Sequence, residues 1–166
     1  SRGLGDVYKR QDHAVQKGIA ALRTGCDIVT DTQMARAGIN KTILASLGGE
    51  VHCFMSDADV AAEAKARGVT RAFVSMERAA ALPKPCIFAI GNAPTALFSL
   101  ENLMEADKLH PALIIGVPVG FVNVVESKEA LFAACAAHGG QGFHAQRAAH
   151  DQGVRHVVKL LENIAD

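Results

Sequence analysis

The sequence predicts an α/β fold, a single domain with a mostly parallel sheet flanked by helices. Short apolar runs alternate with amphipathic helical stretches, which is the pattern of strands buried on both faces and joined by crossover helices. A chain of 166 residues suits one domain with one core. No internal repeat, linker or low-complexity segment divides it, so one domain is expected.

The strands are expected where β-branched and apolar residues run between turn residues, at 26–30, 51–55, 86–90 and 112–117. Helices are expected where apolar residues recur at helical spacing, at 12–24, 32–39, 41–47, 57–68, 70–82, 95–107, 126–138 and 151–165. Asp57 and Gly68 provide start and stop signals for one of these helices.

Composition narrows the class of protein. Lys+Arg and Asp+Glu both total 17, so no net charge favours nucleic acid or an anionic membrane surface. No apolar run approaches the roughly 20 residues of a membrane-spanning helix. The 4 cysteines lie far apart, which indicates buried free thiols in a reducing compartment. We therefore expect a cytoplasmic protein with neither a nucleic-acid nor a membrane partner.

The first eleven residues, "SRGLGDVYKRQ", differ in character from the rest of the chain. They contain the only tyrosine, show no clear periodicity and lead abruptly into a helical pattern. We predict that residues 1–11 are a non-native or misread leader and that residues 12–166 form the domain.

Unusual residues come directly after the strands at their carboxyl ends, where ligands bind in open parallel sheets. Asp31 comes after the first strand, and "GNAPT" (91–95) after the third. In one interpretation Asn92 caps a helix and Pro94 occupies its first turn. In the other, the N–H groups of Ala93 and Thr95 and the Thr95 hydroxyl bind a carboxylate. Local signals favour capping.

The loop after the fourth strand, "GVPVGFVNVVESK" (116–128), is apolar and rich in glycine and proline. Pro118 and Phe121 suit the wall of a pocket, whereas Asn123 and Glu126 resemble a capping box. Lys128 faces either an anion or solvent. Arg71, at a helix start, similarly indicates either a bound anion or simple solvation.

Histidines recur every six residues at 138, 144, 150 and 156, which is wrong for one helical face, so no metal site is predicted. His52 lies within a strand and is expected to pack in the core. Glycine-rich nucleotide-binding fingerprints are absent from the sequence. Motifs alone lead to an α/β protein with an anion-tolerant, apolar-walled crevice.

Two long stretches, "AIGNAPTALF" (89–98) and "PALIIGVPVGFVNVVESKEAL" (111–131), resemble the precorrin-8X methylmutase family of cobalamin biosynthesis. Two more, "LRTGCDIVTDTQMARAGI" (22–39) and "TRAFVSMERAA" (70–80), agree in order and spacing. The resemblance covers roughly residues 12–137.

The resemblance implies a homodimeric α/β isomerase without metal or organic cofactor. It would move a methyl group from C-11 to C-12 of precorrin-8X or cobalt-precorrin-8, giving hydrogenobyrinic or cobyrinic acid. A tetrapyrrole substrate is an apolar ring fringed with carboxylates. The substrate-binding residues expected on this basis are Asp31, Arg71, Gly91, Asn92, Ala93, Pro94, Thr95, Pro118, Gly120, Phe121, Ser127 and Lys128.

The chain also departs from the family pattern. The family's proton-donating histidine lies in an N-terminal helix and has no counterpart here, so the catalytic residue is unknown. The family's C-terminal glycine-rich segment is unmatched, and residues 138–166 form a divergent tail. We therefore expect impaired activity, and the alternative is a non-catalytic α/β module that binds tetrapyrroles or carboxylates.

Overall fold

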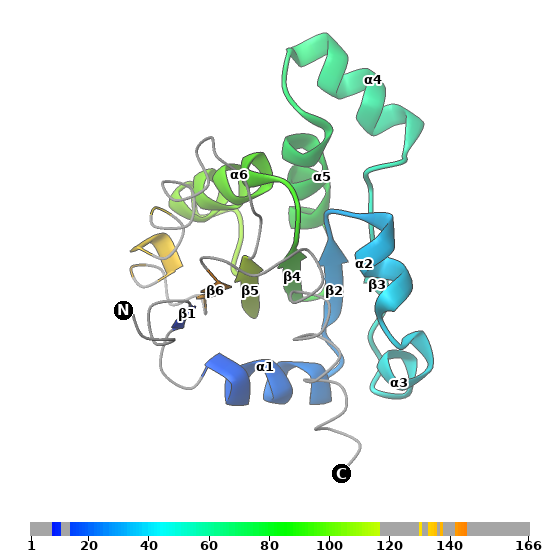
Figure 1. Cartoon of the computed structure of the whole chain (residues 1–166), viewed down its shortest axis with the longest axis vertical. Helices are drawn as coiled ribbons and strands as arrows, with labels where there is room; N and C mark the ends of the chain where they lie inside the picture. Colours follow the sequence, from blue (N-terminus) through cyan, green and yellow to red (C-terminus); the bar gives the residue numbers. More distant parts are fainter. Residues whose placement is uncertain are drawn as a thin grey trace, which may run out of the picture.

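The structure, a computed structural model, describes residues 8–10, 14–116, 130, 133–135, 137 and 142–145 (Figure 1). The strands are β1 Tyr8–Arg10, β2 Asp27–Thr30, β3 Val51–His52, β4 Cys86–Ile90, β5 Leu113–Gly116 and β6 Gly142–Ala145. The helices are α1 Ala14–Arg23, α2 Gln33–Gly38, α3 Lys41–Ser46, α4 Ala58–Arg67, α5 Arg71–Ala80 and α6 Pro94–Glu105.

The strands form one 6-stranded sheet in the order β1-β6-β5-β4-β2-β3. Every neighbouring pair is parallel except β1 with β6, which is antiparallel. Helices lie on both faces of the sheet (Figure 1). The prediction of an α/β fold with a mostly parallel sheet is confirmed.

Side chains alternate between the two faces along each central strand, and each face has its own core. Ile28 and Ile87 pack with Leu22 of α1 and Leu44 of α3. On the other face, the fully buried Phe88 packs with residues of α5 and α6, among them Met76, Leu97, Leu100 and Met104. Because both faces are covered, the strands are buried along their whole length, as their continuous apolar sequence predicted.

Helix α4 extends beyond the sheet and packs on α5 (Figure 1). Val60 and Ala64 form a small core with Val74 of α5. Around it, Arg67 and Arg78 pair with Glu63, Glu77 and Asp59. Such exposed pairs stabilise a fold weakly, so the apolar contacts are the main link between the two helices.

The predicted helices and strands within residues 14–116 all occur, with shifted ends. Gly68 ends α4 in the left-handed conformation, at a φ of 66°, as expected. Asp57 occupies the N-cap position of α4, but its side chain makes no capping hydrogen bond. A further difference is at β3, which pairs over Val51–His52 only, whereas a strand over 51–55 was expected.

Two strands were missed. β6 lies in the segment that was assigned to the divergent tail, and β1 lies within the expected leader. Tyr8–Arg10 therefore pair with the sheet, although residues 1–11 had been left out of the fold. Of the predicted helix at 126–138, the described residues 130, 133–135 and 137 are helical, and the one at 151–165 lies outside the described residues. Within the described part of the chain, no helix is long and apolar enough to cross a membrane.

Candidate functional site at the carboxyl ends of β2 and β4

The connections out of β2 and β4 diverge. From β2 the chain turns to β3 on one side, whereas from β4 it crosses to β5 on the other side. Between neighbouring parallel strands, such a divergence opens a crevice at the carboxyl ends, which is where open α/β sheets bind ligands. Asp31 comes directly after β2, and Gly91, Asn92 and Ala93 come directly after β4, so both segments meet at this point.

Asp31 holds the two segments together. Its Oδ1 accepts a hydrogen bond from the Gly91 N–H at 2.8 Å. Its Oδ2 accepts from the Asn92 N–H at 2.8 Å and from the Ala93 N–H at 2.7 Å. The side chain is 1% exposed, so these charge-assisted bonds compensate a buried carboxylate. We call Asp31 with Gly91, Asn92 and Ala93 the Asp31 clamp.

The clamp corrects two expectations about the start of α6. The N-cap residue is Ala93, without a side-chain hydrogen bond, and not Asn92. The Ala93 N–H, expected to be available for a ligand carboxylate, donates to Asp31 instead. Pro94 occupies the first turn as predicted. The negative charge favoured by a helix N-terminus is therefore supplied by this chain itself.

The beginnings of α5 and α6 are joined beside the clamp. The Thr70 hydroxyl donates to Thr95 Oγ1 at 2.9 Å and accepts from the Phe73 N–H at 3.1 Å, which caps α5. Arg71 comes directly after Thr70 and is exposed. The Thr70–Thr95 hydrogen bond thus places Arg71, at the start of α5, close to the start of α6, which the clamp precedes.

The remaining predicted site residues belong to the loop after β5. That strand ends at Gly116, which lies opposite Ile90 in the sheet register. The loop consequently begins next to the segment that carries the clamp. The residues themselves, namely Pro118, Gly120, Phe121, Ser127 and Lys128, lie outside the described residues.

Sequence reasoning missed two residues at this edge. Thr70 was seen only as the residue before Arg71, although a threonine before a helix is a common capping signal. Met34, in the first turn of α2, is 64% exposed, the one large hydrophobic side chain so exposed in the described part of the chain. An exposed methionine three residues after Asp31 provides an apolar contact surface near the carboxyl end of β2.

His52 is oriented away from this edge. Its Nε2 lies 3.0 Å from Asp27 Oδ2, at the amino end of β2, and its ring stacks on Phe54 at a centroid distance of 5.9 Å. His52 therefore packs against its neighbours, but its side chain is 21% exposed, so it lies outside the core in which it was expected. At the crevice, the described residues offer hydroxyl groups, a guanidinium and an apolar side chain, which suit a large apolar molecule that carries carboxylates.

Comparison with known proteins agrees with this geometry. The family profile described as "Precorrin-8X methylmutase" matches residues 4–142. The chain belongs to the precorrin-8X methylmutase family. This match covers the Asp31 clamp, Arg71, and the segments on either side of Gly116.

Relatives give the same result. The cobalt-precorrin-8 methylmutase of Priestia megaterium is 48% identical over 118 residues, covering 71% of this chain and 52% of that protein. The Salmonella typhimurium enzyme of the same name is 46% identical over 144 residues, covering 82% of this chain and 66% of that protein. The chain thus spans about half to two thirds of the length of these relatives.

Solved structures share the fold. The crystal structure of precorrin-8X methyl mutase from Thermus thermophilus superposes with a TM-score of 0.81 at 28% sequence identity, covering 96% of this chain and 77% of that one. A "precorrin-8X methylmutase related protein" superposes with a TM-score of 0.79 at 25% identity.

Proposed function

We propose that this chain is the core of an isomerase that moves a methyl group from C-11 to C-12 of precorrin-8X or cobalt-precorrin-8 in cobalamin biosynthesis. The family match over residues 4–142 carries the proposal. The product is hydrogenobyrinic acid, or cobyrinic acid in the cobalt series.

The geometry of the crevice supports this function. The migration is intramolecular, so the protein must hold the ring in one orientation and deliver a proton to the correct ring position. We assign Arg71 and Thr95 to the carboxylate fringe and Met34 to the apolar ring. Asp31 is assigned a positioning role, because its carboxylate is buried against three N–H groups of the β4–α6 segment.

The same proposal includes the setting of the reaction. We infer a homodimer in the cytoplasm, which acts on the tetrapyrrole without a metal or organic cofactor. The inference of a reducing compartment is supported by the buried free thiols of Cys26, Cys53, Cys86 and Cys135. Residues 12–166 are proposed as the methylmutase domain, and Tyr8–Arg10 of the preceding segment add β1 to its sheet.

Incubation of the purified chain with precorrin-8X tests the function, with the absorbance of hydrogenobyrinic acid as the readout. Turnover supports the isomerase. Binding of hydrogenobyrinic acid without turnover supports the non-catalytic tetrapyrrole-binding alternative, in which the crevice is retained and the proton donor is lost. Absence of both contradicts the two functions.

Arg71→Ala provides a test of the assigned crevice. We expect about tenfold weaker binding of hydrogenobyrinic acid, because one charge-assisted contact to a carboxylate is lost. Lys65→Ala is the matched control, since Lys65 is also exposed but lies on α4. Equal binding by the two variants would place the ligand elsewhere.

A further inference from the structure

A concave site lies beside β3, the last strand of the sheet. It is a cavity of about 290 Å³ between β3 and the helices α2 and α3, lined by Arg36, Lys41, Leu44, Ala45, Gly49, Glu50 and Val51. This volume is at the small end of ligand pockets, about 300 Å³. None of these lining residues belongs to the Asp31 clamp, which joins the ends of β2 and β4.

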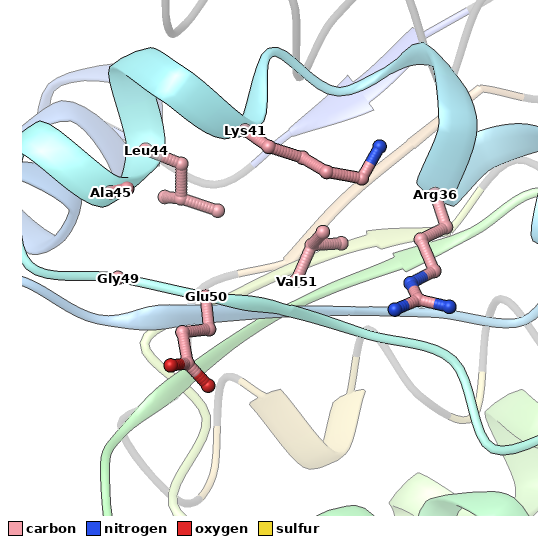
Figure 2. A pocket seen from close by; sticks show the side chains of 7 residues that line it. All are labelled: Arg36, Lys41, Leu44, Ala45, Gly49, Glu50 and Val51. Carbon is pink, nitrogen blue, oxygen red and sulfur yellow. The ribbon is translucent and has the colours of Figure 1, made fainter.

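Two cationic side chains, those of Arg36 and Lys41, line this cavity together with one carboxylate, that of Glu50. Figure 2 shows the side chains of Arg36, from α2, and Lys41, from α3, next to Val51. Within residues 16–116, neither side chain makes an ion pair, whereas Arg67, Arg78 and Lys84 each have an acidic partner. Two like charges directed at one cavity favour an anion between them.

The strand edge adds backbone groups to the same cavity. The Ile28 N–H donates to the Glu50 carbonyl at 2.9 Å, and Ile28 is the register partner of Val51. In a parallel ladder, neighbouring residues direct their N–H and C=O groups to opposite sides. The Val51 N–H and C=O therefore point outward from β2, at the open edge of a strand residue that also lines the cavity.

The other lining groups define the class of ligand. Leu44, Ala45 and Val51 provide an apolar surface. Arg36 and Lys41 contribute two positive charges and Glu50 one negative charge, so the lining carries a net charge of +1. Gly49 keeps the cavity wall close to the sheet, because a Cβ there would lie 2.3 Å from the Cys26 carbonyl oxygen. A small anion with a short apolar stem complements this set in both charge and size.

We propose that this cavity binds a small carboxylate or phosphate anion that bears a short apolar stem. Arg36 binds two oxygens of the anion side by side, Lys41 binds it as a point charge, and the stem lies on Leu44 and Val51. The Val51 N–H donates to the anion. This binding site is independent of the proposed methyl transfer.

The test is a titration of the isotope-labelled full chain followed by amide NMR, with sodium butyrate and with inorganic phosphate, at constant ionic strength set by chloride. We expect a saturable shift of the Val51 amide signal. Saturation by butyrate only identifies a carboxylate with a stem as the ligand, and saturation by phosphate only identifies the phosphate head. Saturation by neither ligand overturns the proposal.

Variants of Arg36 and Lys41 test whether these two side chains bind the anion. Arg36→Ala and Lys41→Ala should each weaken binding about fivefold or more, because each removes a charge-assisted contact. Arg23→Ala, which removes an exposed cation on α1, should leave the affinity unchanged. Glu50→Gln should tighten binding about two- to threefold, because it removes the like charge while the Glu50 backbone bonds to β2 remain. Unchanged affinity in the Arg36→Ala, Lys41→Ala double variant would contradict the proposal.

Discussion

Strand β2 is bounded by two buried aspartates whose charges are compensated in different ways. At its carboxyl end, Asp31 is 1% exposed and accepts hydrogen bonds only from backbone N–H groups, those of Gly91, Asn92 and Ala93. At its amino end, Asp27 is 4% exposed and lies 3.0 Å from His52 Nε2 and 3.6 Å from Lys84 Nζ.

The two aspartates therefore have different roles. Asp31 shapes the candidate site, whereas Asp27 stabilises the sheet. Peptide N–H groups do not titrate, and they lie where the backbone places them, so Asp31 fixes the path of the β4–α6 segment. Asp27 instead depends on side chains, although its Oδ1 also accepts the Glu50 N–H at 2.9 Å. Lys84 is 45% exposed and is screened by salt, which makes the amino end of β2 the more sensitive to solution conditions.

Loss of the Asp31 carboxylate should have the largest effect on stability. We expect Asp31→Ala to lower the free energy of unfolding by about 3–5 kcal/mol, because buried N–H groups lose their acceptor. Asp31→Asn should cost about 2–3 kcal/mol, because the amide keeps one oxygen acceptor but directs its NH₂ group at a donor. Urea unfolding followed by circular dichroism measures both values.

The matched control for Asp31 is Asp57→Ala. Asp57 is exposed, and its side chain makes no capping bond, so its removal should change the free energy of unfolding by less than about 0.5 kcal/mol. If Asp31→Ala were as mild as Asp57→Ala, the Asp31 clamp would not determine the structure of the crevice.

A smaller loss is expected at the amino end of β2. Asp27→Asn should lower the free energy of unfolding by about 1–2 kcal/mol, because the amide oxygen still accepts the Glu50 N–H while the charge opposite His52 and Lys84 is lost. Raising the salt concentration to about 1 M should shrink this loss but not that of Asp31→Asn. Equal salt dependence of the two variants would contradict the comparison.

Most of the fold was predictable from the sequence because β2, β4 and β5 are short, continuous apolar runs that only a sheet covered on both faces can bury. The two edge strands, β1 and β3, and β6 next to β1 were harder to predict. β3 was predicted to be longer than the two residues that pair, and β1 and β6 have no such apolar run. Pairing at a sheet edge depends on the neighbouring strand more than on local propensity.

The position of the candidate site was predictable from the sequence, but the hydrogen bonds that hold it together were not. That Asp31 and "GNAPT" come after strand ends is a local property of the sequence, and a parallel sheet brings such ends together. That the Asp31 carboxylate caps α6 is a contact over a sequence separation of 62 residues, for which no local pattern exists. For the same reason, the Thr70–Thr95 hydrogen bond was missed, although each threonine stands beside a recognised motif.

Two thiols lie at the amino end of β2, because Cys26 precedes Asp27 and Cys86 is the register partner of Asp27. Burial first, and then the nearby Asp27 charge, raise the pKa of Cys26 to about 11, and the same two causes raise the pKa of Cys86 to about 12. Both pKa values exceed the ordinary 9.0, so the unfolded chain loses these protons first. The contribution of the two thiols to stability is therefore complete below pH 9 and is lost as the pH rises toward 11–12.

Asp27→Asn should reduce this alkaline loss. Removing the charge moves the pKa values of Cys26 and Cys86 part of the way back toward 9.0, while burial keeps them raised. Alkylation of the folded chain with iodoacetamide, followed by mass spectrometry across the pH range, should show faster labelling of both cysteines. Asp57→Asn serves as the control. Unchanged labelling in Asp27→Asn would mean that the Asp27 charge does not reach the thiols.

The smallest expected effect is at the junction between α5 and α6. Thr95→Val keeps the shape of the side chain but removes the oxygen that accepts from the Thr70 hydroxyl at 2.9 Å. We expect a loss of about 0.5–1 kcal/mol, because the bond is partly exposed and the Thr70 hydroxyl can turn to water. Thr95→Ser retains the oxygen and should lie closer to the parent chain in urea unfolding. If valine proved as stable as serine at this position, the junction would be held by apolar packing of α5 on α6, and only the Asp31 clamp would fix the start of α6 by hydrogen bonding.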